Sequence, residues 1–237
     1  MHDAIAHAKS YPFPIPSHGY LFADGAWGPL DTAAIDRTGR VPVLAAGSNQ
    51  SPEQLMRKYA GMAGVEFPCQ RAALHDFDVV YAAHLSSYGS VPATFQASPG
   101  TRVTAFVQWL DERALRRMHE TEGNYTYDAL EGIRVELEGD GVLEAAFAYS
   151  SRVGCLNLGG DCVALAAIPA TGRRLRAATE TEALTAVRDR LARGQPLDDF
   201  IAGHLGPAGT EVRLARSAAL GADALPLRFP RRIVHRC

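Results

Sequence analysis

Apolar positions from residue 41 onward recur with the periods of strands and helices. Residues 41–47 form a short apolar run ending in glycine, which is typical of a buried strand that enters a tight loop. Ser51 and Pro52 then provide the cap and first position of a predicted helix over residues 51–60. Alternation predicts a strand within residues 74–85, and two more strands, at 92–97 and 102–110, around a turn at 98–101.

The second half of the chain combines the same two periods. Asp111 caps a predicted short helix that stops at Gly123. Residues 131–149 alternate about the turn 139–141, which predicts a hairpin. Residues 179–194 and 197–206 have helical spacing. A β-rich body decorated by helices favours the α+β class.

Residues 1–40 differ from the rest and are predicted to form an N-terminal arm of extended chain and turns. They are rich in proline, glycine and aromatic residues, which disfavour a helix. The arm is expected to pack on the main domain, residues 41–237, because its large aromatic side chains need cover. These are Tyr11, Phe13, Tyr20, Phe22 and Trp27.

Composition excludes several classes of protein. The 237 residues carry 24 basic and 26 acidic side chains, a formal charge of 24 − 26 = −2, so no global basic field attracts nucleic acid or an anionic membrane. The sequence contains no run of 18 apolar residues, so no transmembrane helix is predicted. The N-terminus does not resemble a signal peptide, so a cytoplasmic location is expected. The four cysteines form no CxxC pair, which argues against a structural zinc site, and Cys155 and Cys162 are expected to be reduced.

The loop Gly47-Ser48-Asn49 is the first candidate site. Glycine lets the backbone approach a ligand closely, and amides at the start of the following helix point outward with partial positive charge. Such a loop suits a carboxylate or a developing oxyanion. The alternative is an ordinary turn with a helix cap.

Glu122 is the second candidate. It follows Leu115 by seven positions and Met118 by four, so it lies on their apolar face, whereas Glu120 points elsewhere. Burial and the negative end of the helix dipole both disfavour a carboxylate, so Glu122 is expected to have a raised pKa suited to proton transfer. The alternative is a frayed helix end with Glu122 in solvent.

The order of these motifs resembles the γ-glutamylcyclotransferase-like superfamily, which includes the AIG2-like proteins. The resemblance spans residues 41–150: strand, Gly-Ser-Asn, helix, the Leu-x-Asp-Phe strand at 74–77, Pro-Ala-Thr-Phe with Ser-Pro-Gly, and a helix ending in Glu-Gly before a tyrosine. It implies a small mixed β-barrel with flanking helices and Glu122 as the catalytic carboxylate. It also implies that the substrate is bound by Ala46, Gly47, Ser48, Asn49, Gln50, Tyr127 and Tyr149, with Tyr125 as the alternative to Tyr127.

The reaction that the resemblance implies is intramolecular aminolysis of a γ-glutamyl amine or peptide, releasing 5-oxoproline, without a metal or organic cofactor. Three departures from the family pattern are visible: Ala46 replaces the loop tyrosine, Gln50 a leucine, and His119 an aspartate. The alternatives are a non-catalytic module that binds a small molecule or a protein, and an amidohydrolase that uses water.

Other catalytic arrangements have less support. Ser48 lacks the Gly-x-Ser-x-Gly elbow of serine hydrolases. The histidines show no HxH or HExxH spacing, and Gly159-Gly160 has no phosphate-loop lysine beside it. His119 is expected on the helix surface, and Tyr88-Gly89-Ser90 is expected to be a turn.

Overall fold

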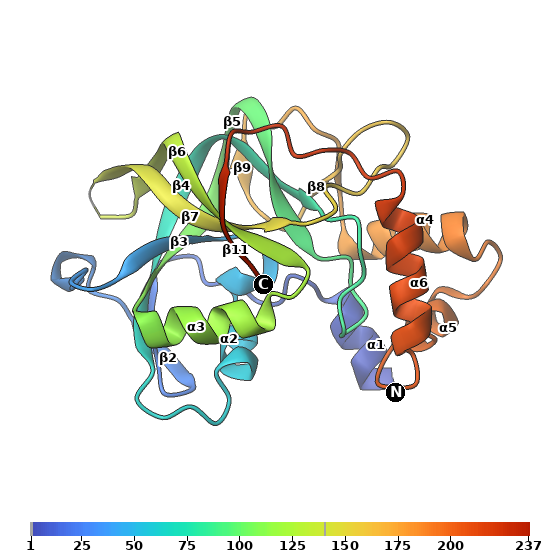
Figure 1. The fold of residues 1–237 in the computed structure, drawn as a ribbon, viewed down its shortest axis with the longest axis horizontal. Helices are drawn as coiled ribbons and strands as arrows, with labels where there is room; N and C mark the ends of the chain where they lie inside the picture. Colours follow the sequence, from blue (N-terminus) through green and yellow to red (C-terminus); the bar gives the residue numbers. More distant parts are fainter. Residues whose placement is uncertain (1, 140) are drawn as a thin grey trace.

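Five strands close into a barrel at the centre of the protein (Figure 1). The structure, a computed structural model, describes residues 2–139 and 141–237. Around the barrel the order is β4–β5–β3–β7–β6, and β6 pairs again with β4 at Ala72–Leu74. All neighbours are antiparallel except β3 and β7, which are parallel. The strands are β3 (Val41–Ala45), β4 (Glu66–Tyr81), β5 (Ala93–Leu110), β6 (Tyr125–Leu137) and β7 (Val142–Ser151). The predicted α+β class and mixed barrel are confirmed.

Short strands extend the barrel sheet at its margins. The hairpin β1–β2 adds to β4, β8 joins β4 to β10, β9 pairs with β5, and β11 pairs with β6. Their bounds are β1 (Tyr20–Ala23), β2 (Ala26–Pro29), β8 (Ala164–Leu165), β9 (Ala170–Thr171), β10 (Ala177–Ala178) and β11 (Arg232–Arg236).

The helices form two groups, visible in Figure 1. Helices α2 and α3 lie together below the barrel, and α1 lies beside α4, α5 and α6 at its right-hand side. The helices are α1 (His2–Lys9), α2 (Pro52–Lys58), α3 (Glu112–Thr121), α4 (Glu180–Leu191), α5 (Leu197–Ala202) and α6 (Thr210–Gly221), with 3-10 turns η1 (Thr32–Ala34) and η2 (Gly47–Gln50). None of the helices in the described residues is long and apolar enough to cross a bilayer.

Two apolar clusters hold these groups to the barrel. One fills the barrel and continues under α4 and α5, with Leu74, Phe95 and Leu184 fully buried. The other lies between the barrel wall and helices α2 and α3, and includes Leu55 and Met118. Each such side chain contributes about 1.5–3 kcal/mol when fully buried, so the second cluster fixes α2 and α3 relative to each other.

The two strands predicted around residues 98–101 are one strand, β5. His75 pairs with Arg102 but Phe77 pairs with Ala97, so four residues of β5 bulge opposite Asp76. The Asp76 carboxylate accepts a hydrogen bond from the Gly100 amide at 2.7 Å. The predicted turn is therefore a bulge, which lets the ladder resume on both sides.

The arm departs from the prediction in two respects. Residues 2–9 form a helix, because its alanine-rich sequence favours one and Ile5 and Ala8, three positions apart, are buried. Trp27 is 48% exposed on the outer strand of the hairpin, whereas the other four arm aromatics are buried. The predicted hairpin of β6 and β7 is confirmed, and in its turn Asp140 lies outside the described residues.

Candidate active site

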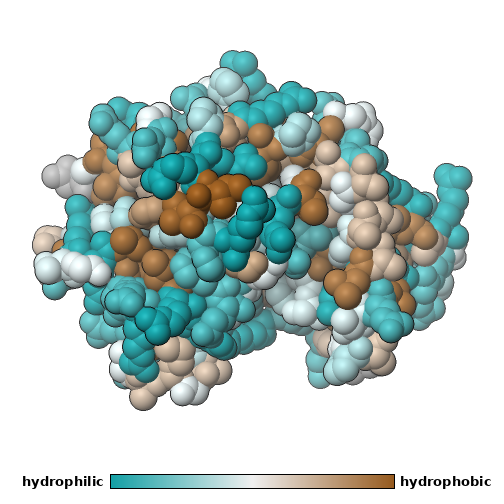
Figure 2. All heavy atoms as spheres, in the orientation of Figure 1, coloured by the Kyte–Doolittle hydropathy of each residue, from teal (hydrophilic) through white to brown (hydrophobic). Residues whose placement is uncertain are grey.

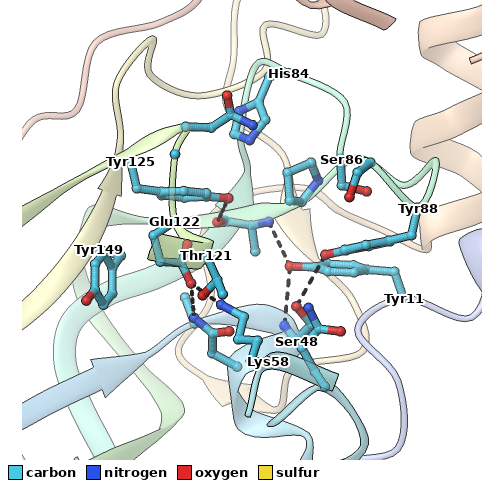
Figure 3. A pocket seen from close by; sticks show the side chains of 18 of the residues that line it. Tyr11, Ser48, Lys58, His84, Ser86, Tyr88, Thr121, Glu122, Tyr125 and Tyr149 are labelled. Atoms are coloured by element: carbon cyan, nitrogen blue, oxygen red, sulfur yellow. Dashed lines mark hydrogen bonds and ion pairs between the residues drawn. The ribbon is translucent and has the colours of Figure 1, made fainter. Parts of the chain in front are cut away.

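A polar cavity of about 120 Å³ lies where η2, the end of α3 and the N-terminal arm meet (Figure 3). Figure 2 shows the same face hollowed between the α2–α3 pair and α1. The lining residues are Tyr11, Leu44, Ala46, Ser48, Asn49, Gln54, Lys58, His84, Ser86, Ser87, Tyr88, Pro92, Ala93, Thr121, Glu122, Gly123, Asn124, Tyr125 and Tyr149.

Helix α3 delivers Glu122 to this cavity. Asp111 caps the helix by accepting a hydrogen bond from the Ala114 amide at 2.7 Å, as predicted. Met118 is fully buried, so the face that carries it turns inward, and Glu122 ends the helix one turn later with 5% of its surface exposed. The solvent-exposed alternative for Glu122 is therefore wrong.

The Glu122 carboxylate is held through one of its two oxygens. Asn49 Nδ2 donates to Oε1 at 2.8 Å, and Lys58 Nζ forms an ion pair with the same atom. Among residues 2–139 and 141–237, no hydrogen-bond donor is found on Oε2. The second oxygen of an anchored carboxylate thus remains available to a ligand in the cavity.

Lys58 is a site residue that the sequence analysis missed. Its side chain is 8% exposed at the end of α2, with Nζ 3.5 Å from Met118 Sδ. Lys58 therefore places a buried cation directly beside the Glu122 carboxylate. Helical spacing gave one indication of this position, because Lys58 lies three positions after the buried Leu55 and therefore shares its face of α2.

The loop after β3 is built as a 3-10 turn followed by α2. Ser51 stands at the predicted cap position with Pro52 after it, although the Ser51 side chain makes no capping hydrogen bond. Asn49 turns its amide to Glu122, while the backbone amide of Ser48 donates to the Tyr11 hydroxyl at 3.3 Å. Gly47 adopts a φ of 51°, and a Cβ there would lie 2.0 Å from that hydroxyl oxygen. Glycine is required at this position because the phenol approaches so closely.

Position 46 carries an alanine, and two tyrosines from elsewhere in the chain form an aromatic wall of the cavity instead. Tyr11, from the arm, also accepts from the Ala93 amide at 2.8 Å, and its ring is stacked with that of Tyr88. The Tyr88 hydroxyl lies 3.4 Å from Ser48 Oγ, and Tyr88-Gly89-Ser90 forms the predicted turn. Burial raises the pKa of Tyr88 to about 12 and that of Tyr11 well above its ordinary value, so both phenols are neutral.

The predicted substrate-binding residues divide into two sets. Ala46, Ser48, Asn49 and Tyr149 line the cavity together with Glu122, but Gly47, Gln50 and Tyr127 do not. Gln50 is fully buried away from it, and Tyr127 stacks on Phe147 at 4.8 Å within the barrel wall. Tyr125, the alternative to Tyr127, lines the cavity, because it stands at the start of β6 and donates to the Ala93 carbonyl at 3.0 Å.

His84 is a second site residue without a sequence signal. It lies in the loop between β4 and β5, with 4% of its surface exposed and its ring edge-on to Tyr125. Burial lowers the pKa of His84 to about 4, so the imidazole is neutral at pH 7. It adds a neutral donor and acceptor to the cavity rather than a charge.

His119 is half-buried, so only part of its side chain lies on the helix surface where it was expected. Its ring packs edge-on against Tyr127 and Tyr149, and its Nδ1 lies 2.8 Å from the Tyr149 hydroxyl. The two cysteines expected to be reduced, Cys155 and Cys162, are free thiols.

Two solved structures are similar to this chain at low sequence identity. No protein-family model and no curated protein matches the chain. A solved structure described as a gamma-glutamyl cyclotransferase is 16% identical, with a TM-score of 0.38 over 82% of this chain and 93% of that chain. An uncharacterized protein from Homo sapiens is also 16% identical, with a TM-score of 0.39 over 82% of this chain and 94% of that chain.

Proposed function

We propose that this protein cyclises a γ-glutamyl amine or peptide, releasing 5-oxoproline and an amine. One observation carries the proposal: Glu122 is anchored in a polar cavity through Oε1 and keeps Oε2 for a ligand. A fixed carboxylate with one free oxygen is suited to accept and return a proton at a single point.

The proposed reaction uses that oxygen twice. The α-ammonium of the substrate gives a proton to Glu122 Oε2, and the resulting amine attacks the γ-carbonyl carbon of the same molecule. A new C–N bond closes a five-membered ring and leaves a tetrahedral oxyanion. The departing nitrogen then takes the proton from Glu122 as the original C–N bond breaks. The ring nitrogen passes its second proton to the released amine, which leaves as an ammonium, so no water and no cofactor is consumed.

Lys58 and Asn49 position the acid in this scheme. Both hold Oε1, which fixes the direction of Oε2, and the ammonium stabilises the carboxylate before and after each transfer. General acid–base transfer contributes about 10²–10⁴ in rate. Holding the folded conformer of a substrate that carries its own nucleophile supplies a further, entropic contribution.

The Tyr11 hydroxyl is the proposed donor to the oxyanion. The loop amides were the predicted donors, but the Ser48 amide already donates to the Tyr11 hydroxyl. Because the Tyr11 oxygen accepts from two backbone amides, its own O–H is polarised as a donor.

The test is product analysis by mass spectrometry with a panel of γ-glutamyl amines and glutathione. We expect 5-oxoproline from the wild type and a loss of at least 10²-fold in Glu122→Gln. Glu120→Gln is the matched control, since Glu120 is on the same helix but 56% exposed. Because Glu122→Gln leaves Lys58 unpaired, its melting curve and that of Lys58→Met/Glu122→Gln are recorded alongside.

Each other outcome rejects either the role of Glu122 or the cyclase assignment. Full turnover in a folded Glu122→Gln variant would remove Glu122 from the mechanism. Free glutamate carrying one ¹⁸O from labelled water identifies an amidohydrolase. Unchanged substrates that nevertheless raise the melting temperature identify a binding module.

A further inference from the structure

Three metal-ligating side chains converge beside the cavity, outside its lining. They are His119 at the end of α3, His235 on β11, and Cys237 just after β11. One ligand atom from each lies within 4.8 Å of the other two. Neither the proposed reaction nor the family resemblance gives His235 and Cys237 a task.

The fold aims these residues at one another. Strand β11 pairs with β6 so that His235 lies opposite Tyr127, the residue that also packs against His119. Residues two apart on a strand share a face, which puts Cys237 on the same side as His235. A register shift between Ile233 and His235 re-aims the end of β11, as bulges do next to functional sites.

The spacing fits a tetrahedral metal ion. Cys237 Sγ lies 3.7 Å from His119 Nδ1, and the rings of His119 and His235 are 4.7 Å apart between centroids. Bonds of about 2.1 Å to nitrogen and 2.3 Å to sulfur at a tetrahedral angle separate the two ligand atoms by about 3.6 Å. The observed nitrogen–sulfur distance therefore already matches two ligands of one ion.

We propose that His119, His235 and Cys237 bind a single Zn²⁺. Two imidazoles and a thiolate are a ligand set that Zn²⁺ prefers, and three protein ligands leave its fourth position open. On binding, the thiol of Cys237 releases its proton to solvent and each neutral imidazole supplies a lone pair. His235 is exposed, so the ion has a path from solvent.

A metal ion at this site would affect the cavity through Tyr149. The Tyr149 hydroxyl now pairs with His119 Nδ1, so a metal on that nitrogen replaces the hydrogen bond and frees a phenol that lines the cavity. The ion would also tie β11 to α3, three residues before Glu122.

The experiment is a titration of the reduced, metal-free protein with Co²⁺, followed by absorption spectroscopy. We expect cobalt–thiolate charge transfer in the near ultraviolet and intense tetrahedral d–d bands, saturating at one equivalent and disappearing when Zn²⁺ is added. Cys237→Ser removes the charge-transfer band, and His235→Ala weakens Co²⁺ binding at least tenfold. Cys162→Ser is the matched thiol control and keeps the full spectrum.

Three results overturn the proposal: no charge-transfer band in the wild type, a band that persists in Cys237→Ser, or a band lost in a folded Cys162→Ser variant. Circular dichroism establishes folding, which the His235 and Cys237 variants should retain because His235 lies near the end of β11 and Cys237 just after it. The readout is independent of turnover, so its failure is distinguishable from failure of the proposed function.

Discussion

The buried pair of Lys58 and Glu122 makes a prediction that does not depend on the substrate. Their side chains are 8% and 6% exposed. Removing one partner of such a pair leaves a charge that neither water nor a counter-ion stabilises, at a cost of about 3–5 kcal/mol. We therefore expect Lys58→Met and Glu122→Gln each to lower the free energy of unfolding at pH 7 by about that amount.

The double variant should recover most of this loss. With both charges gone, the site holds a thioether and an amide of similar volume, and replacing a whole buried pair is often close to neutral. The two single effects should thus be non-additive by at least about 2 kcal/mol.

Urea denaturation followed by tryptophan fluorescence measures these free energies, with the buried Trp109 as a reporter. Arg116→Met and Glu112→Gln are the controls, since that pair is 72% and 87% exposed on the same helix as Glu122 and should contribute little. Additive losses within about 0.5 kcal/mol, or single losses no larger than those of the controls, would refute the buried ion pair.

Three further predictions concern the surroundings of the site. In the folded protein the pKa of His84 is lowered to about 4, so the unfolded state binds more protons between pH 6.5 and 4. The free energy of unfolding should therefore fall by about 3 kcal/mol as the pH drops through this range. A plot of that free energy against pH should be flatter for His84→Phe, and an unchanged slope in acid denaturation contradicts the assignment. Gly47→Ala should lower the melting temperature, because the new Cβ meets the Tyr11 hydroxyl and the left-handed backbone adds about 1 kcal/mol of strain. Combined with Tyr11→Phe, the loss of stability should be smaller than the sum of the two single losses; strict additivity counts against the contact. Asp111→Ala should cost about 1 kcal/mol by uncapping α3, and equal urea midpoints for variant and wild type speak against that cap.

Helical spacing located the acid but not its partner. Glu122 was found because Leu115 and Met118 mark an apolar face of α3, and Lys58 shares a face of α2 with the buried Leu55 in the same way. A lysine in the last turn of a helix normally extends into solvent, so sequence alone favours that placement. Only the packing of α2 against α3 shows that this ammonium is enclosed.

The other residues that line the cavity come from segments whose apolar residues show neither helical nor strand spacing. Tyr11 and His84 lie in an arm and a loop, where the path of the chain is set by tertiary contacts that no local pattern encodes. Tyr125 and Tyr127 share a strand face, so alternation cannot distinguish the one at the rim from the one in the wall. The class and barrel were predictable from the order of the motifs, whereas the long-range register, the β5 bulge, α6 and β11 were not.

Tyr11 supplies a phenol to a loop that lies thirty-odd positions later in the sequence, so the groups of the site need not be neighbours in the sequence. A search for a tyrosine next to Gly-Ser-Asn passes over a chain like this one, although an aromatic hydroxyl stands above the same three residues. Chains with this arrangement are better sought by the spatial positions of the acid, the loop and the hydroxyl than by any contiguous sequence motif.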